Sequence, residues 1–166
     1  MDRALNSRRG ALSLVPSVAP GTAQPRASFC SHCGIRPEVE NPTSRVCGRC
    51  GLGLILESRA DVAPAAGDPF LVLDSTLAVC AVSRAAERLL VTNETDAVNH
   101  HVTELLVPAD AEAQGPTNLA AAVTWAARGD EAVRRVVLRP ANTFGVRLTA
   151  RITSCGPPTA ALIVFE

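Results

Sequence analysis

The sequence predicts an α+β fold in which a small cysteine-rich unit precedes a five-stranded antiparallel sheet with helices on one side. Three observations favour this fold. Two Cys-x-x-Cys-Gly pairs lie close together, at Cys30/Cys33 and Cys47/Cys50. Short β-like runs precede and follow a stretch of helical periodicity. Residues 145–154 alternate apolar and polar side chains, which is typical of a half-buried antiparallel strand.

The chain of 166 residues is long enough for one domain of ordinary size and a smaller unit. Its formal net charge is zero. We predict a disordered tail over 1–27, a cysteine-rich unit over 28–58, a linker over 59–67 and a larger domain over 68–166. The longest apolar run is too short to cross a membrane. The N-terminus is only weakly similar to an export signal, so we expect a cytoplasmic protein.

Four of the six cysteines form the two pairs. A Cys-x-x-Cys turn points two thiolates at one ion, and two such turns complete the tetrahedron that zinc prefers. Gly34 and Gly51 follow the pairs, where a flexible backbone lets amide groups face the sulfurs. The stretch resembles the zinc-ribbon family, and this implies one structural zinc per chain. Its ligands would be Cys30, Cys33, Cys47 and Cys50.

Two other interpretations of the pairs remain open. Two disulfides would need an oxidising compartment, which the N-terminus supports poorly. A redox Cys-x-x-Cys would belong at a strand-to-helix turn of a thioredoxin-like unit, and no such unit surrounds the pairs. His32 lies inside the first pair, where we expect it to point outward, and it is a candidate substitute ligand. A closed four-thiolate site has no open position for zinc catalysis.

The larger domain begins with two short apolar runs, 69–74 and 77–82, which predict a hairpin around an aspartate turn. Ser83 is the expected cap of the helix that follows. A short helix is expected across Val102–Leu106. A longer helix should begin at the Thr117 cap and end at Gly129. The buried face of that longer helix should consist of Leu119, Ala122, Val123 and Ala126.

Three strands complete the pattern, over 132–138, 145–154 and 159–166. In the middle strand we expect one face to lie in the core and the other to face solvent. The core face would carry Val146, Leu148, Ala150 and Ile152. The solvent face would carry Arg147, Thr149, Arg151 and Thr153.

The stretch PFLVLDSTLAVCAVSRAAERLL resembles the opening of a PAS domain, with a strand, an aspartate turn, a second strand and a helix. VTELLVPAD is similar to the segment that follows in that family. The resemblance covers about residues 68–166. PAS domains are sensory and interaction modules, and some of them bind a cofactor. The resemblance therefore implies a regulatory protein in signal transduction.

The residues do not match the PAS members that bind flavin or haem, so we expect neither cofactor. Flavin-photosensing members carry a reactive cysteine after an asparagine, whereas here His100 follows Asn99. Haem-binding members take a histidine from the long helix, and residues 117–128 contain none. We place His100 and His101 in a solvent-facing loop, and we expect Trp125 to pack against the sheet.

No nucleophile–base pair or phosphate-binding loop is evident in the sequence, so we expect no enzymatic activity. We expect the protein to act through a protein partner or a second copy of itself. The expected surface is the polar sheet face, where Arg147 and Arg151 suit acidic groups.

Two alternative functions remain. Nucleic acid could bind the arginines of the cysteine-rich unit, although acidic residues dilute this patch and it has no stacking platform. The arginines concerned are Arg26, Arg36, Arg45, Arg49 and Arg59. The other alternative is a small-ligand or redox sensor. Cys80 and Cys155 could serve in it, but both lie on expected strands, where cysteine usually acts as a small buried hydrophobe.

Overall fold

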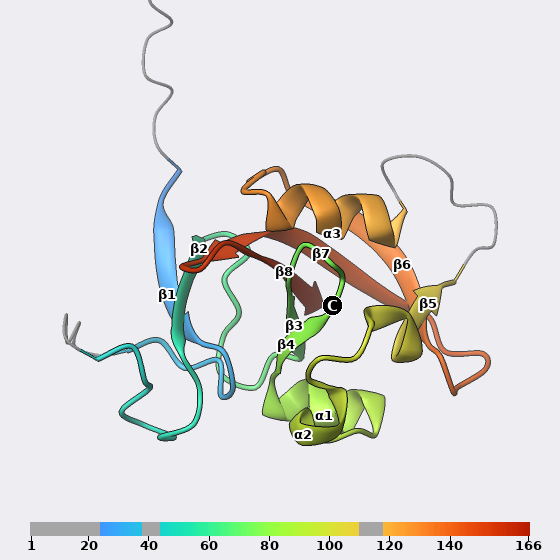
Figure 1. Ribbon diagram of the computed structural model, residues 1–166, viewed down its shortest axis with the longest axis horizontal. Helices are drawn as coiled ribbons and strands as arrows, with labels where there is room; N and C mark the ends of the chain where they lie inside the picture. The colour runs from blue at the N-terminus through green and yellow to red at the C-terminus, as the bar shows by residue number, and fades with distance from the viewer. Residues whose placement is uncertain (1–23, 38–43, 110–117) are drawn as a thin grey trace, which may run out of the picture.

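The computed structural model describes residues 24–37, 44–109 and 118–166 (Figure 1). Most of the tail expected over 1–27 and the Thr117 cap lie outside these residues. Arg26 and Ala27, which we expected in the tail, begin the first strand. Among the described residues, no helix is long and apolar enough to cross a membrane.

A single antiparallel sheet of eight strands organises the described residues (Figure 1). Its main path runs through β1 (Arg26–Cys30), β2 (Ile55–Arg59), β7 (Leu148–Gly156), β8 (Ala160–Phe165), β3 (Phe70–Leu73) and β4 (Val79–Val82). Two more strands, β6 (Arg134–Pro140) and β5 (Leu106–Pro108), extend from β7. The α+β class is confirmed, and the five expected strands are β3, β4, β6, β7 and β8.

In the part of the chain that the structure describes, three α-helices and one 3-10 turn lie between these strands: α1 (Arg84–Leu90), α2 (Glu94–Ala97), the turn over Val102–Glu104, and α3 (Leu119–Ala127). Ser83 caps α1 as expected, because its Oγ accepts the amide of Ala86 at 3.2 Å. Asn118 caps α3, and Gly129 follows the helix with a φ of +93°. The helix expected over Val102–Leu106 is only the 3-10 turn, after which the chain enters β5.

The first core lies between the helices and the concave face of the curled sheet. Leu119 and Ala122 of α3 are buried there opposite Ala150 and Ile152 of β7, as the sequence predicted. The expected packing of Trp125 against the sheet is confirmed only in part, because the residue is 39% exposed. Its ring lies under the guanidinium of Arg134, a residue of β6.

A second core covers the opposite face of the same sheet. We use the term cysteine unit for residues 24–37 and 44–59. Phe29 and Leu56 of this unit, with Val62 just after it, pack on sheet residues that point away from the helices. The Phe29 and Phe70 rings meet edge to face, with centroids 5.6 Å apart. The sheet residues are Phe70, Val72, Ala81, Cys155, Ala160, Leu162 and Val164.

The predicted linker over 59–67 therefore does not lie between two separate cores. Ser58 of β2 pairs with Cys155 of β7, so the cysteine unit continues the sheet of the larger domain. Val62, inside the expected linker, is only 1% exposed. Apolar side chains occur in both segments, and joining them removes more apolar surface from water than two separate cores would. Whether residues 28–58 or 68–166 fold alone stays a prediction.

The expected solvent face of β7 is also partly covered. Thr153 is fully buried, and its hydroxyl donates to the Glu131 carbonyl at 3.1 Å. Arg151 donates to the Asp61 carbonyl at 2.8 Å, so the segment after the cysteine unit lies over this face. Val146, expected in the core, is 39% exposed, because the strand begins two residues later.

Replacement of Phe29 by alanine should lower the free energy of unfolding of the whole chain. Truncation of a buried phenylalanine costs about 3–5 kcal/mol, and the shared core should spread that cost to the larger domain. The fluorescence of Trp125, the single tryptophan, reports unfolding of the larger domain. Phe144→Ala is the matched control, because Phe144 is 87% exposed. Unchanged Trp125 melting in Phe29→Ala would contradict the shared core.

Candidate metal centre

The four paired cysteines converge on one point. Their Sγ atoms all lie within 4.8 Å of one another. The sulfurs of Cys30 and Cys50 are 3.6 Å apart, and those of Cys33 and Cys47 are 4.0 Å apart. A tetrahedral zinc with Zn–S bonds of about 2.3 Å places neighbouring sulfurs about 3.8 Å apart. The cluster therefore fits a four-thiolate zinc site without rearrangement.

Two turns of the same geometry present these sulfurs. The amide of Gly34 donates to the Cys30 carbonyl at 2.9 Å, and the amide of Gly51 donates to the Cys47 carbonyl at 2.9 Å. Both glycines have a φ of +70°, a conformation that side chains other than glycine rarely adopt. The glycine after each pair thus has the role that the sequence predicted.

Gly53 is a necessary neighbour that the sequence analysis missed. A Cβ at this position would lie 2.5 Å from the Cys30 sulfur and 2.7 Å from the His32 amide nitrogen. The Gly53 carbonyl also accepts the amide of Cys47 at 2.8 Å, which links the second turn to its own hairpin. The sequence feature that could have indicated this role is a glycine three residues after the last cysteine of the two pairs.

The surroundings of the sulfurs shift the pKa values of these thiols in different directions. Burial raises the pKa of Cys30 and of Cys33 above the usual value. Burial also acts to raise the pKa of Cys50. The amides of Gly53 and Leu52, and then the neighbouring thiols, outweigh burial and lower this pKa to about 6. Zinc binding by this set would release the remaining thiol protons, since the metal binds thiolates.

We expected His32 to point outward, but its side chain is buried. It is also not part of the sulfur cluster. It is 7% exposed, and its Nδ1 lies 3.3 Å from a carboxylate oxygen of Glu94. Its carbonyl accepts the amide of Arg84, the first residue of α1, at 2.9 Å. The first cysteine turn therefore docks against the start of α1, and its imidazole lies beside Glu94 at the start of α2.

Polar contacts fix the cysteine unit in place. Arg26, Arg45 and Arg59, three of the five arginines considered for nucleic-acid binding, each contact another part of the chain. Their partners are, in order, the Glu131 carboxylate, the Pro157 carbonyl and the Glu131 carbonyl. These contacts use guanidinium groups that phosphate would otherwise engage.

The remaining candidate residues lie apart from the cluster. All six cysteines are free thiols. Cys155 is buried in the second core, and burial raises its pKa to about 12. Cys80 is exposed, so the expectation of a buried position is wrong for it. His100 and His101 are exposed, as expected, and they contact their near neighbours Glu104 and Thr103.

Protein purified without exposure to a chelator should contain one zinc per chain, because four thiolates fill one tetrahedral site. Elemental analysis measures this ratio, and a value near zero would contradict the assignment. Cys47→Ser should lose the metal. It should also lower the melting temperature of the Trp125 signal, because the cysteine unit shares a core with the sheet.

Gly53→Ala should weaken zinc binding at least tenfold, because the added methyl group would overlap the Cys30 sulfur. Gly48→Ala is the control, since a Cβ at Gly48 meets no atom within 4 Å. Competition with a chromophoric chelator measures both affinities. Equal zinc affinities for the two variants would show that Gly53 does not shape the site.

No family model matches the sequence, and no curated protein matches it. Among solved structures, the chain is similar to the PAS domain of an HTR-like protein from Haloarcula marismortui, with 15% identity, a TM-score of 0.43, and 60% of this chain and 84% of that chain covered. It is also similar to the PAS domain of nitrogen regulation protein NR(II) from Vibrio parahaemolyticus, with 15% identity, a TM-score of 0.42, and 60% and 88% covered. Apart from α2 and β5, which the sequence analysis did not predict, the elements of this chain from β3 to β8 follow the order predicted from its sequence.

Proposed function

We propose that the chain is a regulatory interaction module, in which a structural zinc ribbon is built onto a PAS-like domain. It acts through protein contacts and has no catalytic output of its own. The observation that carries this proposal is the core that the cysteine unit shares with the sheet. A metal held there would stabilise the body of the domain.

The zinc would be held by Cys30, Cys33, Cys47 and Cys50, and bound zinc contributes folding free energy at such sites. The residues around the cluster have structural tasks. Gly34 and Gly51 form the turns, and the His32 carbonyl connects the first turn to α1. A four-thiolate site has no free position for substrate, which supports a structural role.

We place the contact surface on the part of the outer sheet face that the cysteine unit leaves uncovered. This part lies on β6 and the start of β7, where Val137 pairs with Thr149. Val137 is 42% exposed, and the side chain of Arg135 is 72% exposed. An exposed apolar residue beside an arginine has the composition of an interface centre. Arg135 lies 3.5 Å from the Glu166 carboxylate, and an acidic partner or an acidic segment of a second copy would compete with Glu166 for its guanidinium.

Affinity purification from the native host, with quantitative mass spectrometry and light scattering, tests this proposal. Val137→Asp should reduce recovery of the partner, or the fraction of dimer, at least tenfold, because it places a carboxylate in an apolar contact. Val91→Asp is the control, since Val91 is 90% exposed at the end of α1. Trp125 melting shows whether both variants remain folded.

Two results would contradict the proposal. Wild-type protein that is monomeric and enriches no partner above background would refute the interaction function. Equal recovery with Val137→Asp and wild type would refute the assigned surface.

A further inference from the structure

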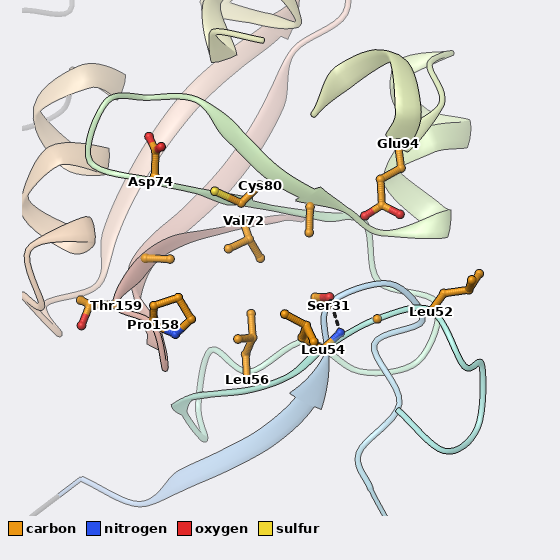
Figure 2. Close-up of a pocket in the computed structure, with 13 residues that line it drawn as sticks. Ser31, Leu52, Leu54, Leu56, Val72, Asp74, Cys80, Glu94, Pro158 and Thr159 are labelled. Carbon is orange, nitrogen blue, oxygen red and sulfur yellow. Dashed lines mark hydrogen bonds between the residues drawn. The ribbon is translucent and has the colours of Figure 1, made fainter. Parts of the chain in front are cut away.

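A pocket of about 260 Å³ lies between the cysteine unit and the sheet (Figure 2). Three leucines of the cysteine unit, Leu52, Leu54 and Leu56, form one side. The other side is the sheet, with Val72, Ala81 and Ala160. The pocket exists because the cysteine unit docks on this face of the sheet, and Glu94, the first residue of α2, also lines it.

The walls of the pocket are held on both sides. Val72, Ala81 and Ala160 belong to the second core. On the opposite wall, Gly53 lies directly against the Cys30 sulfur, so the metal cluster supports this wall from behind. Leu52 and Leu54 are 68% and 45% exposed, so they lie where the pocket meets solvent. An occupant would cover apolar surface that the folded chain leaves in water.

The charges along the pocket have one sign. Asp74 and Glu94 line it from opposite ends, and among the described residues that line it none is basic (Figure 2). Burial raises the pKa of Asp74, but hydrogen bonds from Thr76 and Ala78 outweigh it and lower the pKa, so this carboxylate is ionised at neutral pH. Cys80 is exposed as a residue, yet partial desolvation of its thiol and the charge of Asp74 raise the pKa of this thiol, which is therefore neutral at pH 7. The field in the pocket thus favours a cation and opposes an anion.

Glu94 is the carboxylate that faces the pocket most directly in Figure 2. One of its oxygens accepts the amide of Val82 at 3.1 Å, and the other lies 3.3 Å from the Nδ1 of His32. These contacts hold the carboxylate in one orientation, so a ligand would meet a fixed acceptor. Each carboxylate oxygen has lone pairs for a second donor.

We propose that this pocket binds a small amphipathic cation, which places an apolar group of about one ring between the leucines and the sheet and a protonated amine near Glu94 or Asp74. The volume sets the size, since an apolar cavity of about 150 Å³ is enough for benzene, whereas drug-sized ligands occupy about 300–1,000 Å³. This site would give the module a chemical input. It goes beyond the proposed function and does not depend on the contact surface on β6.

Three probes of matched shape test the charge and the site: 2-phenylethylamine, 2-phenylethanol and phenylacetate. Each is titrated into nitrogen-15-labelled, zinc-loaded protein, and amide chemical shifts are recorded. The amine should shift the amides of Gly53, Leu54, Ala81 and Ala160 and bind at least tenfold more tightly than the alcohol. Phenylacetate should cause no saturable shift there. Equal binding of amine and alcohol, or no shift at these amides at millimolar amine, would overturn the proposal.

A pair of variants at one exposed position separates charge from shape. Cys80 lines the pocket, and its side chain is exposed. Cys80→Lys introduces a positive charge, and Cys80→Met adds a neutral side chain of similar length. The Cys80→Lys variant should bind the amine at least tenfold more weakly than the Cys80→Met variant. The two variants should bind the alcohol with affinities within threefold of each other. Equal amine affinity in the two variants would contradict a cation site. Because Cys80 belongs to β4 and not to β6, partner recovery remains an independent measurement of the proposed function.

Discussion

The packing of Phe29, Leu56 and Val62 onto the outer face of the sheet is the contact on which the other features depend. It places the β1–β2 hairpin so that Ser58 can pair with Cys155, and this pairing makes the cysteine unit an edge of the sheet. The same packing buries the sheet face that would otherwise meet water. It also brings the three leucines opposite Val72 and Ala81, which creates the pocket. A polar residue at position 29 would remove the basis of all three features.

The sulfur cluster and this packing support each other. In the alternating pattern of β2, Leu56 and Ser58 point into the body of the structure. The hairpin can present these side chains only if its far end is held, because so short a segment has too little core of its own. Four thiolates around one metal would hold that end. The docked sheet in turn covers Phe29, which is fully buried.

Features set by neighbouring residues could be predicted from the sequence. The cysteine turns need a glycine at a positive φ, the Ser83 cap needs a nearby hydroxyl, and the buried face of α3 follows from helical spacing. Features set by distant residues could not be predicted. Thr153 belongs to a polar stripe that suggests a solvated face, yet a carbonyl from the Glu131 loop satisfies its hydroxyl. No local pattern distinguishes these two environments.

His32 and Gly53 illustrate the same limit within the site. Their roles depend on Glu94 and on the Cys30 sulfur, which lie in other segments of the chain. The cysteine spacing predicts a tetrahedron of sulfurs, but it carries no information on which helix the turn will contact. The sulfur cluster was therefore predicted from its cysteines, whereas its surroundings required the fold.

The pairing of β2 with β7 joins segments nearly a hundred residues apart, and this has a consequence for synthesis. A ribosome adds roughly 5–20 residues per second, so β2 emerges several seconds before the strand that will pair with it. During that interval Phe29 and Leu56 have no sheet to cover them. Zinc captured by the four thiols would give the nascent N-terminal segment a local structure before its long-range contacts can form. Metal supply during translation would then influence how much of the chain reaches its folded state.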